Sequence, residues 1–235
     1  MSVNCVIGLQ WGDEGKGRIV DYLAQQADMV IRFQGGDNAG HTVVNEKGKF
    51  GLHILPSGIF NEDTMNIVGA GTVVNFDRMH SELEEIEKVT GEKIESVFID
   101  ERAHIIMPYH MALDGAEEGK RSESEKIGTT KRGIGPCYQD KAARCGIRAA
   151  DILDEETLRK KLSALLVKKN RELEYYGLPT YTLEELMEKA KGWREEFGNN
   201  IIDTNPAVRE AVEEGRNILL EGQLGIMRDN DWGIY

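Results

Sequence analysis

The first hundred residues alternate short apolar runs with glycine-rich loops. Residues 3–9, 29–33 and 65–74 are apolar runs that contain β-branched residues. Their length and composition predict strands, and the first reads as a buried strand. Residues 18–27 and 77–91 carry apolar positions at helical spacing, and a glycine ends the second of these segments. The order of strand, loop, helix and strand predicts an α/β fold with a largely parallel sheet.

The middle of the chain has a different pattern. From residue 151 to about residue 197 most positions are good helix formers, and five leucines fall on one helical face. These are Leu158, Leu162, Leu165, Leu166 and Leu173. Thr182 and Glu185 have the spacing of a capping box, which predicts the start of a second helix. Asn205 followed by Pro206 predicts the start of a third.

The last part of the chain returns to the first pattern. Residues 217–222, "NILLEG", again read as a buried strand. We therefore expect residues 1–100 to form the first part of an α/β core, residues 101–200 a mainly helical subdomain, and residues 201–235 a return to the core. The glycine-rich end "GQLGIMRDNDWGIY" has no element after it, and we expect the chain to be truncated there.

Charge and cysteine content narrow the class of protein. The 235 residues carry a formal net charge of −12, which argues against nucleic acid as a partner because such binding needs clustered basic residues. No apolar run approaches the roughly 18 residues of a membrane span. Cys5, Cys137 and Cys145 lack metal-ligand spacing, and Cys5 lies in an apolar run, which predicts a buried free thiol. We expect a cytoplasmic protein with no membrane partner.

The loop "GDEGKG" follows the first predicted strand and precedes a predicted helix. It differs from a P-loop, because Arg18 stands where a magnesium-binding hydroxyl is needed. One interpretation is an ordinary turn in which Gly12, Gly15 and Gly17 supply positive φ. The other is an anion site, built from backbone N–H groups at a helix start and from Lys16. A second glycine-rich loop after the next strand favours the anion site, since open parallel sheets bind ligands at such strand ends.

Two acids inside this loop require an explanation. Asp13 suits either a Mg²⁺ ligand or a base that takes a proton from a second substrate, and one carboxylate can serve both purposes. Glu14 suits a charge at the helix N-terminus or a residue behind the site. His41, in the second loop beside Asn38, is either structural or a donor to a phosphoryl or carbonyl oxygen.

The most basic stretch of this acidic chain is "KIGTTKRGIGPCYQDKAARCGIR", residues 126–148. Its glycines and proline predict a loop. It contains Thr129, Thr130, Lys131, Arg132, Lys141, Arg144 and Arg148. A solvated basic surface is one interpretation, and a loop that grips the phosphate of a second, anionic substrate is the other.

Several motifs occur together in one order: "QWGDEGKG", "GGDNAGHT", "LHILPSGI", the basic stretch and "EGQLG". Together they resemble the adenylosuccinate synthetase family through nearly the whole chain. That family uses GTP to join IMP and L-aspartate into adenylosuccinate. The resemblance implies an α/β core with a helical subdomain and a smaller third part. It also implies one Mg²⁺ per subunit, GTP as co-substrate and a homodimer.

The resemblance also implies roles for single residues. Asp13 corresponds to the base that takes the N1 proton of IMP and, with the carbonyl of Gly40, binds Mg²⁺; His41 corresponds to the catalytic acid. The implied GTP-binding residues are Gly12, Asp13, Glu14, Gly15, Lys16, Gly17, Arg18, Gly40, His41 and Thr42. The implied IMP-binding residues are Asp13, Lys16, Asn38, Ala39, Gly40, His41, Thr130, Arg144 and Gln223, with Arg144 reaching across the homodimer interface.

The chain departs from the family pattern at several points. Arg18 replaces a lysine, Asp37 replaces a histidine or asparagine, and the glutamine of the last motif comes one place early, as Gln223, so that Leu224 occupies its position. The chain has about half the usual family length, so we expect the segments that read guanine and bind L-aspartate beyond Tyr235. Two alternatives stay open: a GTPase-type switch module, which has no use for the basic stretch, and a non-catalytic fragment that binds IMP or GTP.

Overall fold

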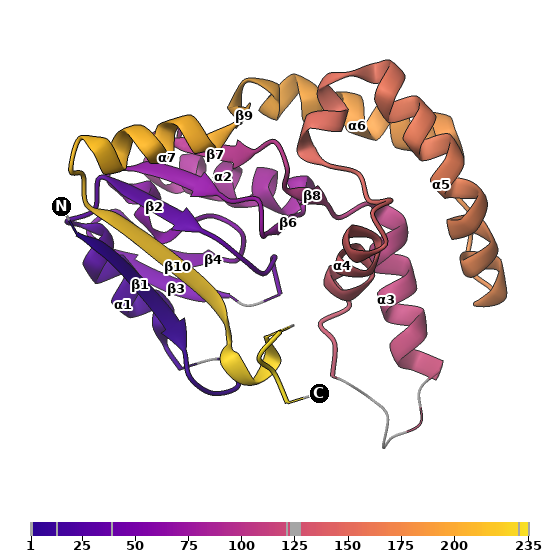
Figure 1. The fold of residues 1–235 in the computed structure, drawn as a ribbon, viewed down its shortest axis with the longest axis horizontal. Helices are drawn as coiled ribbons and strands as arrows, with labels where there is room; N and C mark the ends of the chain where they lie inside the picture. Colours follow the sequence, from indigo (N-terminus) through magenta and orange to yellow (C-terminus); the bar gives the residue numbers. More distant parts are fainter. Residues whose placement is uncertain are drawn as a thin grey trace. The chain divides into compact units, whose positions relative to one another are not determined.

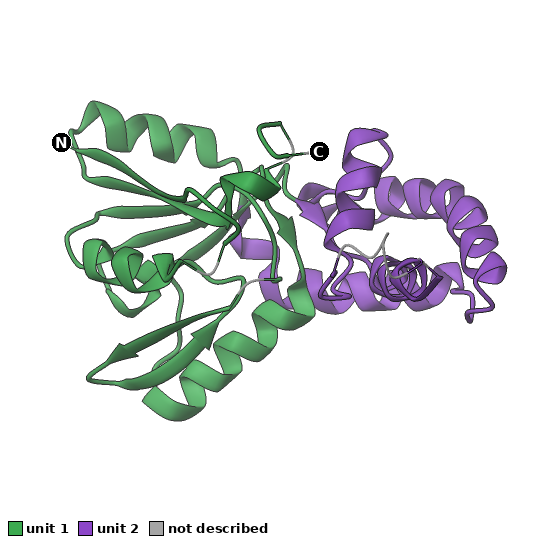
Figure 2. Cartoon of the chain, turned by 90° about the horizontal axis from the view of Figure 1, so that it is seen from below, with its two compact units in different colours: residues 1–103, 202–235 green, residues 104–201 purple. Residues whose placement is uncertain are grey.

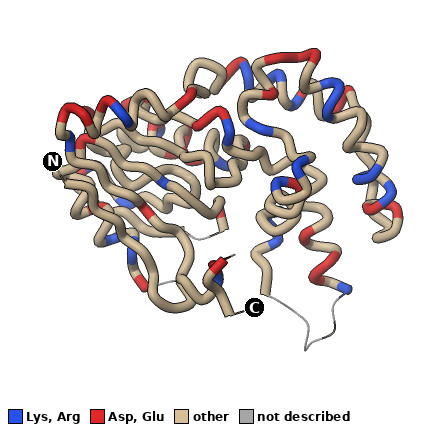
Figure 3. The backbone as a smooth tube through the Cα atoms, in the orientation of Figure 1, with Lys and Arg blue, Asp and Glu red and all other residues tan. Residues whose placement is uncertain are grey.

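The computed structural model describes residues 2–12, 14–38, 40–120, 122, 128–229 and 231–234. The chain divides into two compact units, coloured separately in Figure 2. Unit 1 consists of residues 1–103 together with 202–235, and unit 2 consists of residues 104–201. Acidic and basic residues are interspersed along the helices of both units (Figure 3).

Unit 1 is built on a six-stranded sheet. Its strands, in spatial order, are β1 (Val3–Gly8), β10 (Ile218–Gly225), β2 (Met29–Arg32), β5 (Met65–Val68), β7 (Val97–Asp100) and β9 (Ile201–Ile202). The registers from β1 to β7 are parallel, with Val3 opposite Ile218 and Ile218 opposite Met29. The predicted α/β fold with a largely parallel sheet is therefore confirmed. Figure 1 shows β10, from the end of the chain, lying between β1 and β2.

Helices pack on opposite faces of this sheet because neighbouring residues of a strand point to opposite sides. On one face, Val30 and Leu219 pack against Val20 of α1 (Lys16–Ala24). On the other face, Met29, Ile67 and Ile218 pack against Ala211 of α7 (Thr204–Glu213). The sheet and these two helices thus form three layers, and the start of α1 lies at the carboxyl end of β1.

Local signals placed some helix ends correctly and others not. The helix α2 (Phe76–Thr90) ends at Gly91, whose φ of 72° is left-handed, as the sequence predicted. The start of α7 was predicted at Asn205, but Asp203 is the N-cap, and its carboxylate accepts a hydrogen bond from the Asn205 backbone N–H. An aspartate two residues earlier caps equally well, so the helix begins there.

The first strand corrects a prediction. β1 was expected to be buried, with Cys5 inside, yet Val3, Cys5 and Ile7 are all partly or largely exposed, and the Cys5 thiol is accessible. The reason is position: among the described residues, β1 lies at one end of the strand order and pairs with β10 alone. An apolar run alone does not distinguish an edge strand from a central one.

The remaining elements of unit 1 are short. The hairpin of β3 (His41–Asn45) and β4 (Gly48–Leu52) is antiparallel. A 3₁₀ turn, η1 (Ser57–Phe60), and the short strand β6 (Val73–Val74) follow it, and η4 (Ile226–Arg228) follows β10. The hairpin matters for the site because β3 begins at His41.

Unit 2 is mainly helical. It contains β8 (His104–Ile105), α3 (Pro108–Lys120), α4 (Ile134–Ala142), η2 (Ala149–Leu153), α5 (Glu155–Tyr175), α6 (Leu183–Phe197) and η3 (Gly198–Asn200). All five leucines of the predicted apolar face of α5 are buried. The capping box of Thr182 and Glu185 is present at the start of α6. Within the described part of the chain, no helix is both long and apolar enough to cross a bilayer.

Candidate active site

The first glycine loop connects β1 to α1 in unit 1. Gly12 and Gly15 have φ values of 97° and 82°, which residues with a side chain rarely adopt. Gly15 is the N-cap of α1, and among the described residues no side chain caps the helix or adds an acid to its first turn. The N–H groups of that turn therefore remain available to an anion, and the helix dipole favours one.

Glu14 folds back onto its own loop. Its carboxylate accepts hydrogen bonds from the backbone N–H groups of Gln10 and Gly12, both at 3.1 Å, and lies 2.6 Å from Lys16 Nζ. The hydrogen bond from Lys16 is the main reason that the pKa of Glu14 falls to about 2. Backbone N–H groups and a lysine ammonium, which are groups of the kind that bind phosphate, thus bind the loop's own Glu14 carboxylate.

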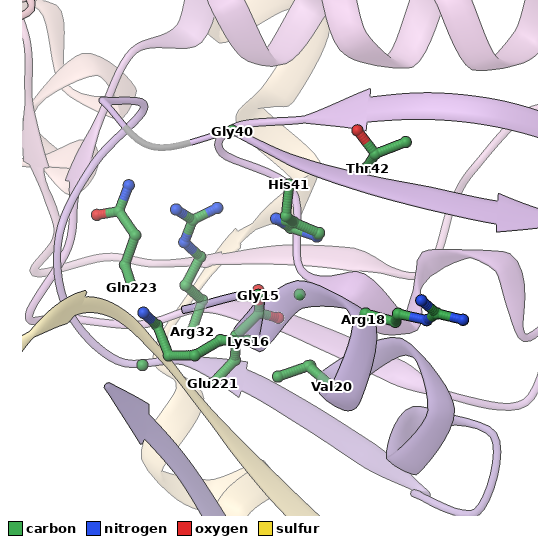
Figure 4. Close-up of a pocket in the computed structure, with 12 residues that line it drawn as sticks. Gly15, Lys16, Arg18, Val20, Arg32, Gly40, His41, Thr42, Glu221 and Gln223 are labelled. Carbon is green, nitrogen blue, oxygen red and sulfur yellow. The ribbon is translucent and has the colours of Figure 1, made fainter. Parts of the chain in front are cut away.

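A cavity of about 260 Å³ opens beside this loop (Figure 4). Its lining residues come from the first glycine loop and α1, from β2, from the second glycine loop with β3, and from β10. They are Gly15, Lys16, Gly17, Arg18, Val20, Arg32, Gly40, His41, Thr42, Glu221, Gly222 and Gln223. The fold thus brings eight of the predicted site residues together: Gly15, Lys16, Gly17, Arg18, Gly40, His41, Thr42 and Gln223.

His41 is held tightly in this cavity. A Cβ atom at Gly17 would lie 2.3 Å from the Cβ of His41, so only glycine at position 17 allows α1 to approach the ring. On another side, His41 Nε2 lies 2.8 Å from Ser57 Oγ. Burial lowers the pKa of His41; Glu221 opposes this effect and Arg32 adds to it. The imidazole is therefore neutral at neutral pH.

Two residues that differ from the family pattern, Asp37 in the second glycine loop and Gln223 in β10, have structural explanations. Gln223 is buried, and its side-chain amide both accepts from the backbone N–H of Gly36, at 2.7 Å, and donates to the Gly36 carbonyl. Asp37 is also buried and accepts a hydrogen bond of 3.0 Å from Asn75 Nδ2. Because Asn75 caps α2, Asp37 ties the second glycine loop to that helix.

Other predicted residues lie elsewhere. Gly12, Glu14 and Asn38 belong to the two loops but do not line the cavity. Asp13 and Ala39 lie outside the described residues, so the predicted base is not placed. Among the residues that the structure describes, no group of three His, Cys, Asp or Glu side chains is suited to a metal.

The donor set at the cavity still fits magnesium, which takes few protein ligands and fills its shell with phosphate and water. Gly40 lines the cavity and has a backbone carbonyl of the hard-oxygen kind that Mg²⁺ prefers. The second expected ligand, the carboxylate of Asp13, is among the residues that are not described.

Thr130 and Arg144 belong to unit 2. Arg144 is exposed and has a left-handed φ of 60°, which is uncommon for a residue with a side chain. The turn that contains it is fixed by the Asp140 carbonyl, which accepts from the N–H groups of Cys145 and Gly146. Arg144 lines a second cavity, of about 560 Å³, with His104, Lys141, Cys145, Gly146, Arg148, Lys161, Ala164, Leu165 and Lys168. The lining contains five basic side chains and no acid.

Three polar residues at or next to the cavity were not predicted: Arg32, Ser57 and Glu221. Arg32 is 1% exposed, and its Nη2 donates to the Gly36 carbonyl at 2.9 Å. Ser57 and Glu221 stand behind His41 and are both buried. Arg32 lies at the end of an apolar strand, whereas Ser57 and Glu221 fall in the motifs "LHILPSGI" and "EGQLG", where no role was assigned to them. Only the tertiary fold brings Ser57 and Glu221 to His41.

A parallel α/β core with a glycine loop at the start of its first helix, a lysine at that loop and a histidine opposite is typical of α/β proteins that bind phosphate groups. The model of the adenylosuccinate synthetase family matches residues 5–235. The chain therefore belongs to the adenylosuccinate synthetase family, as its motifs predicted.

Individual relatives agree with this assignment. The chain is 44% identical over 235 residues to adenylosuccinate synthetase 1 of Methanosarcina acetivorans, and 46% identical over 236 residues to adenylosuccinate synthetase of Dehalococcoides mccartyi. Each alignment covers 100% of this chain and 55% of the relative, so the chain spans about half the length of the curated relatives it matches.

Solved structures show the same fold. The fully ligated adenylosuccinate synthetase from Plasmodium falciparum superposes with a TM-score of 0.86 at 35% identity, covering 99% of this chain and 54% of that protein. The succinoaminodeoxyadenylate synthetase of cyanophage S-2L superposes with a TM-score of 0.63 at 19% identity, covering 100% of this chain and 54% of that protein. The second likeness shows the fold alone.

Proposed function

We propose that this chain provides the phosphate-binding and proton-transfer groups of an adenylosuccinate synthetase, a cytoplasmic ligase. The reaction joins IMP and L-aspartate, with GTP converted to GDP and phosphate. The observation that carries the proposal is the cavity where Lys16, His41 and Gln223 meet, each from a separate element of unit 1. A GTPase-type switch is not supported, since Arg18 lines the cavity where such a protein needs a hydroxyl.

The phosphates of GTP are assigned to the first glycine loop. The N–H groups at the start of α1 and the ammonium of Lys16 stabilise negative charge there. Arg18, Gly40 and Thr42 lie on the same cavity. When bound by Asp13 and Gly40, Mg²⁺ supplies positive charge next to the phosphates.

The chemistry is assigned to two side chains. Asp13 accepts the N1 proton of IMP, so that O6 of the base becomes nucleophilic toward the γ-phosphate. His41 stands by the oxygen where charge develops. The amine of L-aspartate then displaces the phosphate. This explains why a phosphate loop carries an acid: the loop also performs the proton transfer.

The remaining assignments concern IMP. Asn38, Ala39 and Gln223 are assigned to the nucleotide, and Thr130 and Arg144 to its phosphate. Arg144 contributes across the interface of a homodimer. The exposed, left-handed position of Arg144 in the lining of a basic cavity supports a role in holding an anion.

The proposal is tested in a version of the chain extended to the length of its relatives. Adenylosuccinate formation is followed with IMP, L-aspartate, GTP and Mg²⁺. Asp13→Asn should nearly abolish turnover, and His41→Ala should lower kcat by about 100-fold. The exposed His80 provides the control, and His80→Ala should leave kcat unchanged. An Asp13→Asn variant that keeps a tenth of the wild-type kcat would contradict the assignment of the base.

Arg144 is tested separately. Arg144→Leu should raise the KM for IMP and leave the KM for GTP nearly unchanged. Mixed dimers of Arg144→Leu and Asp13→Asn subunits should recover activity, because one hybrid site then has both residues. Confirmed heterodimers without activity would exclude a shared site.

A further inference from the structure

Three segments distant in the sequence meet behind the cavity of unit 1. His41 begins β3, Ser57 begins η1, and Glu221 lies in β10. His41 Nε2 is 2.8 Å from Ser57 Oγ, and Ser57 Oγ is 3.2 Å from Glu221 Oε1. A second hydrogen bond, from the backbone N–H of Ser57 to Glu221 Oε2 at 2.9 Å, fixes the carboxylate. These contacts form a continuous chain from Glu221 to the imidazole.

The donors and acceptors of this chain determine where the protons lie. As a carboxylate, Glu221 can only accept, and it faces both the N–H and the hydroxyl of Ser57. The hydroxyl has a single proton, which it donates to Glu221 Oε1. Ser57 Oγ then has only lone pairs left for His41, so Nε2 of the ring must be the donor. In a neutral ring, Nδ1 is consequently the acceptor.

The opposite arrangement is unfavourable for an electrostatic reason. If the hydroxyl donated to His41 Nε2, a Ser57 lone pair would face a carboxylate oxygen in a buried site. Ser57 is 1% exposed and Glu221 is 4% exposed, so water cannot easily relieve that repulsion. A buried polar group without its hydrogen bond costs about 1–3 kcal/mol, and more when it is charged.

We infer that Ser57 and Glu221 are positioning residues for His41. They hold the imidazole with its proton on Nε2 and leave Nδ1 as the nitrogen available to a ligand in the cavity, where it can only accept. His41 can therefore serve as the acid of the proposed reaction only after Nδ1 has taken a proton from a donor group of the bound ligand. Gly17 completes the arrangement, because α1 packs against the Cβ of His41 and limits rotation of the side chain. Neither Ser57 nor Glu221 needs to touch the substrate for this role.

The inference is tested on the 235-residue chain without any assay of activity. Two-bond ¹H–¹⁵N correlation spectra of the imidazoles, recorded at one pH above the ordinary histidine pKa, identify the tautomer of each ring. His41→Gln assigns the His41 signals. We expect the wild-type ring to carry its proton on Nε2. A wild-type ring protonated on Nδ1 would overturn the inference.

Variants separate positioning from a purely structural role. Ser57→Ala and the isosteric Glu221→Gln should shift the His41 nitrogens toward values averaged between the two tautomers, whereas Ser57→Thr should retain the wild-type pattern. His110 provides an internal control, since the Met107 N–H donates to its Nδ1 and Asp140 lies 2.9 Å from its Nε2. Its signals should stay unchanged wherever the variant folds. Wild-type His41 signals in both folded variants would exclude positioning.

A second readout rests on the proposed function. In the extended enzyme, Ser57→Ala should lower kcat by roughly 10-fold or more, with the KM values for GTP and IMP nearly unchanged, and Ser57→Thr should restore most of kcat. A rise in KM with kcat unchanged would show that the pair orders the pocket and does not position His41. Because the spectra do not depend on turnover, failure of the proposed reaction would leave the tautomer result intact.

Discussion

Glu14 and Lys16 close the first glycine loop on itself, with 2.6 Å between the carboxylate and the ammonium. The same carboxylate accepts from two backbone N–H groups of the loop. An incoming phosphate needs these donors, so it competes with a carboxylate that belongs to the protein. The acids of the loop therefore differ in character: Asp13 is assigned to chemistry, and Glu14 is an internal competitor for the anion site.

Removing the charge of Glu14 should make the loop a better anion site. For Glu14→Gln we expect tripolyphosphate, without magnesium, to bind roughly three- to tenfold more tightly, because a repulsion on the order of 1 kcal/mol is removed. Isothermal titration calorimetry measures the change. Glu46→Gln makes the same charge change on an exposed turn and should have little effect. Unchanged or weaker binding in Glu14→Gln would show that the loop needs its carboxylate.

Two helical glycines should respond oppositely to alanine. In Gly17→Ala the new Cβ would lie 2.3 Å from the Cβ of His41, so α1 or β3 must move, and we expect a loss of about 1–3 kcal/mol. At Gly192, in α6, a Cβ would have no atom within 4 Å, and alanine there should stabilise by about 0.5–1 kcal/mol. Urea unfolding of both variants decides the matter. Equal effects would contradict the close approach of His41 to α1.

The stability of unit 1 should depend on pH through Asp100. Burial of this carboxyl favours its neutral form, but hydrogen bonds from Arg102 and Thr204 outweigh burial and lower its pKa. The folded pKa thus lies below that of an unfolded aspartate, about 3.9. The stabilisation is present above that pH and is lost as the pH falls through the lowered folded value.

The measurement compares wild type with Asp100→Asn by urea unfolding from pH 6 down to about pH 3. At neutral pH the variant should be less stable by about 2 kcal/mol, because it weakens hydrogen bonds from a charged partner. The difference should shrink as the pH falls. Two curves that stay parallel over the whole range would show that Asp100 does not cause the acid sensitivity.

The accessible position of Cys5 predicts the order in which the thiols react. Cys5 is exposed on β1, Cys145 is intermediate, and Cys137 is buried, with burial strongly raising its pKa. With a disulfide reagent under native conditions, we expect the fast phase to disappear in Cys5→Ser and Cys137 to react only after unfolding. A fast phase that survives in Cys5→Ser would place the accessible thiol elsewhere.

Local sequence signals predicted the features whose causes are local. The capping box joins Thr182 to Glu185, three positions further along, and Gly91 ends α2 through its own backbone conformation. The glycine loops predicted the position of the site for the same reason, because their signal also lies within a few consecutive residues. The sequence could not show that β10 enters the sheet next to β1, because that pairing joins residues more than two hundred positions apart. The predicted burial of Cys5 failed for this reason.

The site shows the same division. His41 was predicted from its glycine-loop neighbours. Its partner Glu221 opens the motif "EGQLG", 180 positions away, but nothing in that motif indicates a link to His41, because the link through Ser57 depends on the tertiary fold. Arg32 was missed because an arginine at the end of a strand usually reaches solvent. In the structure it is buried, and its Nη2 donates a hydrogen bond to the Gly36 carbonyl.

The position of β10 between β1 and β2 determines the order in which the two units can fold during synthesis. Both neighbours leave the ribosome early, but the strand that joins them follows about a hundred residues of unit 2, which are contiguous and can fold as they emerge. Until Gly225 has been translated, β1 has no neighbour to join it to β2, and the cavity lacks the wall that holds Glu221 and Gln223. We therefore expect a nascent chain to bind no nucleotide phosphate before β10 is inserted, and the helical unit to resist proteases before unit 1 does.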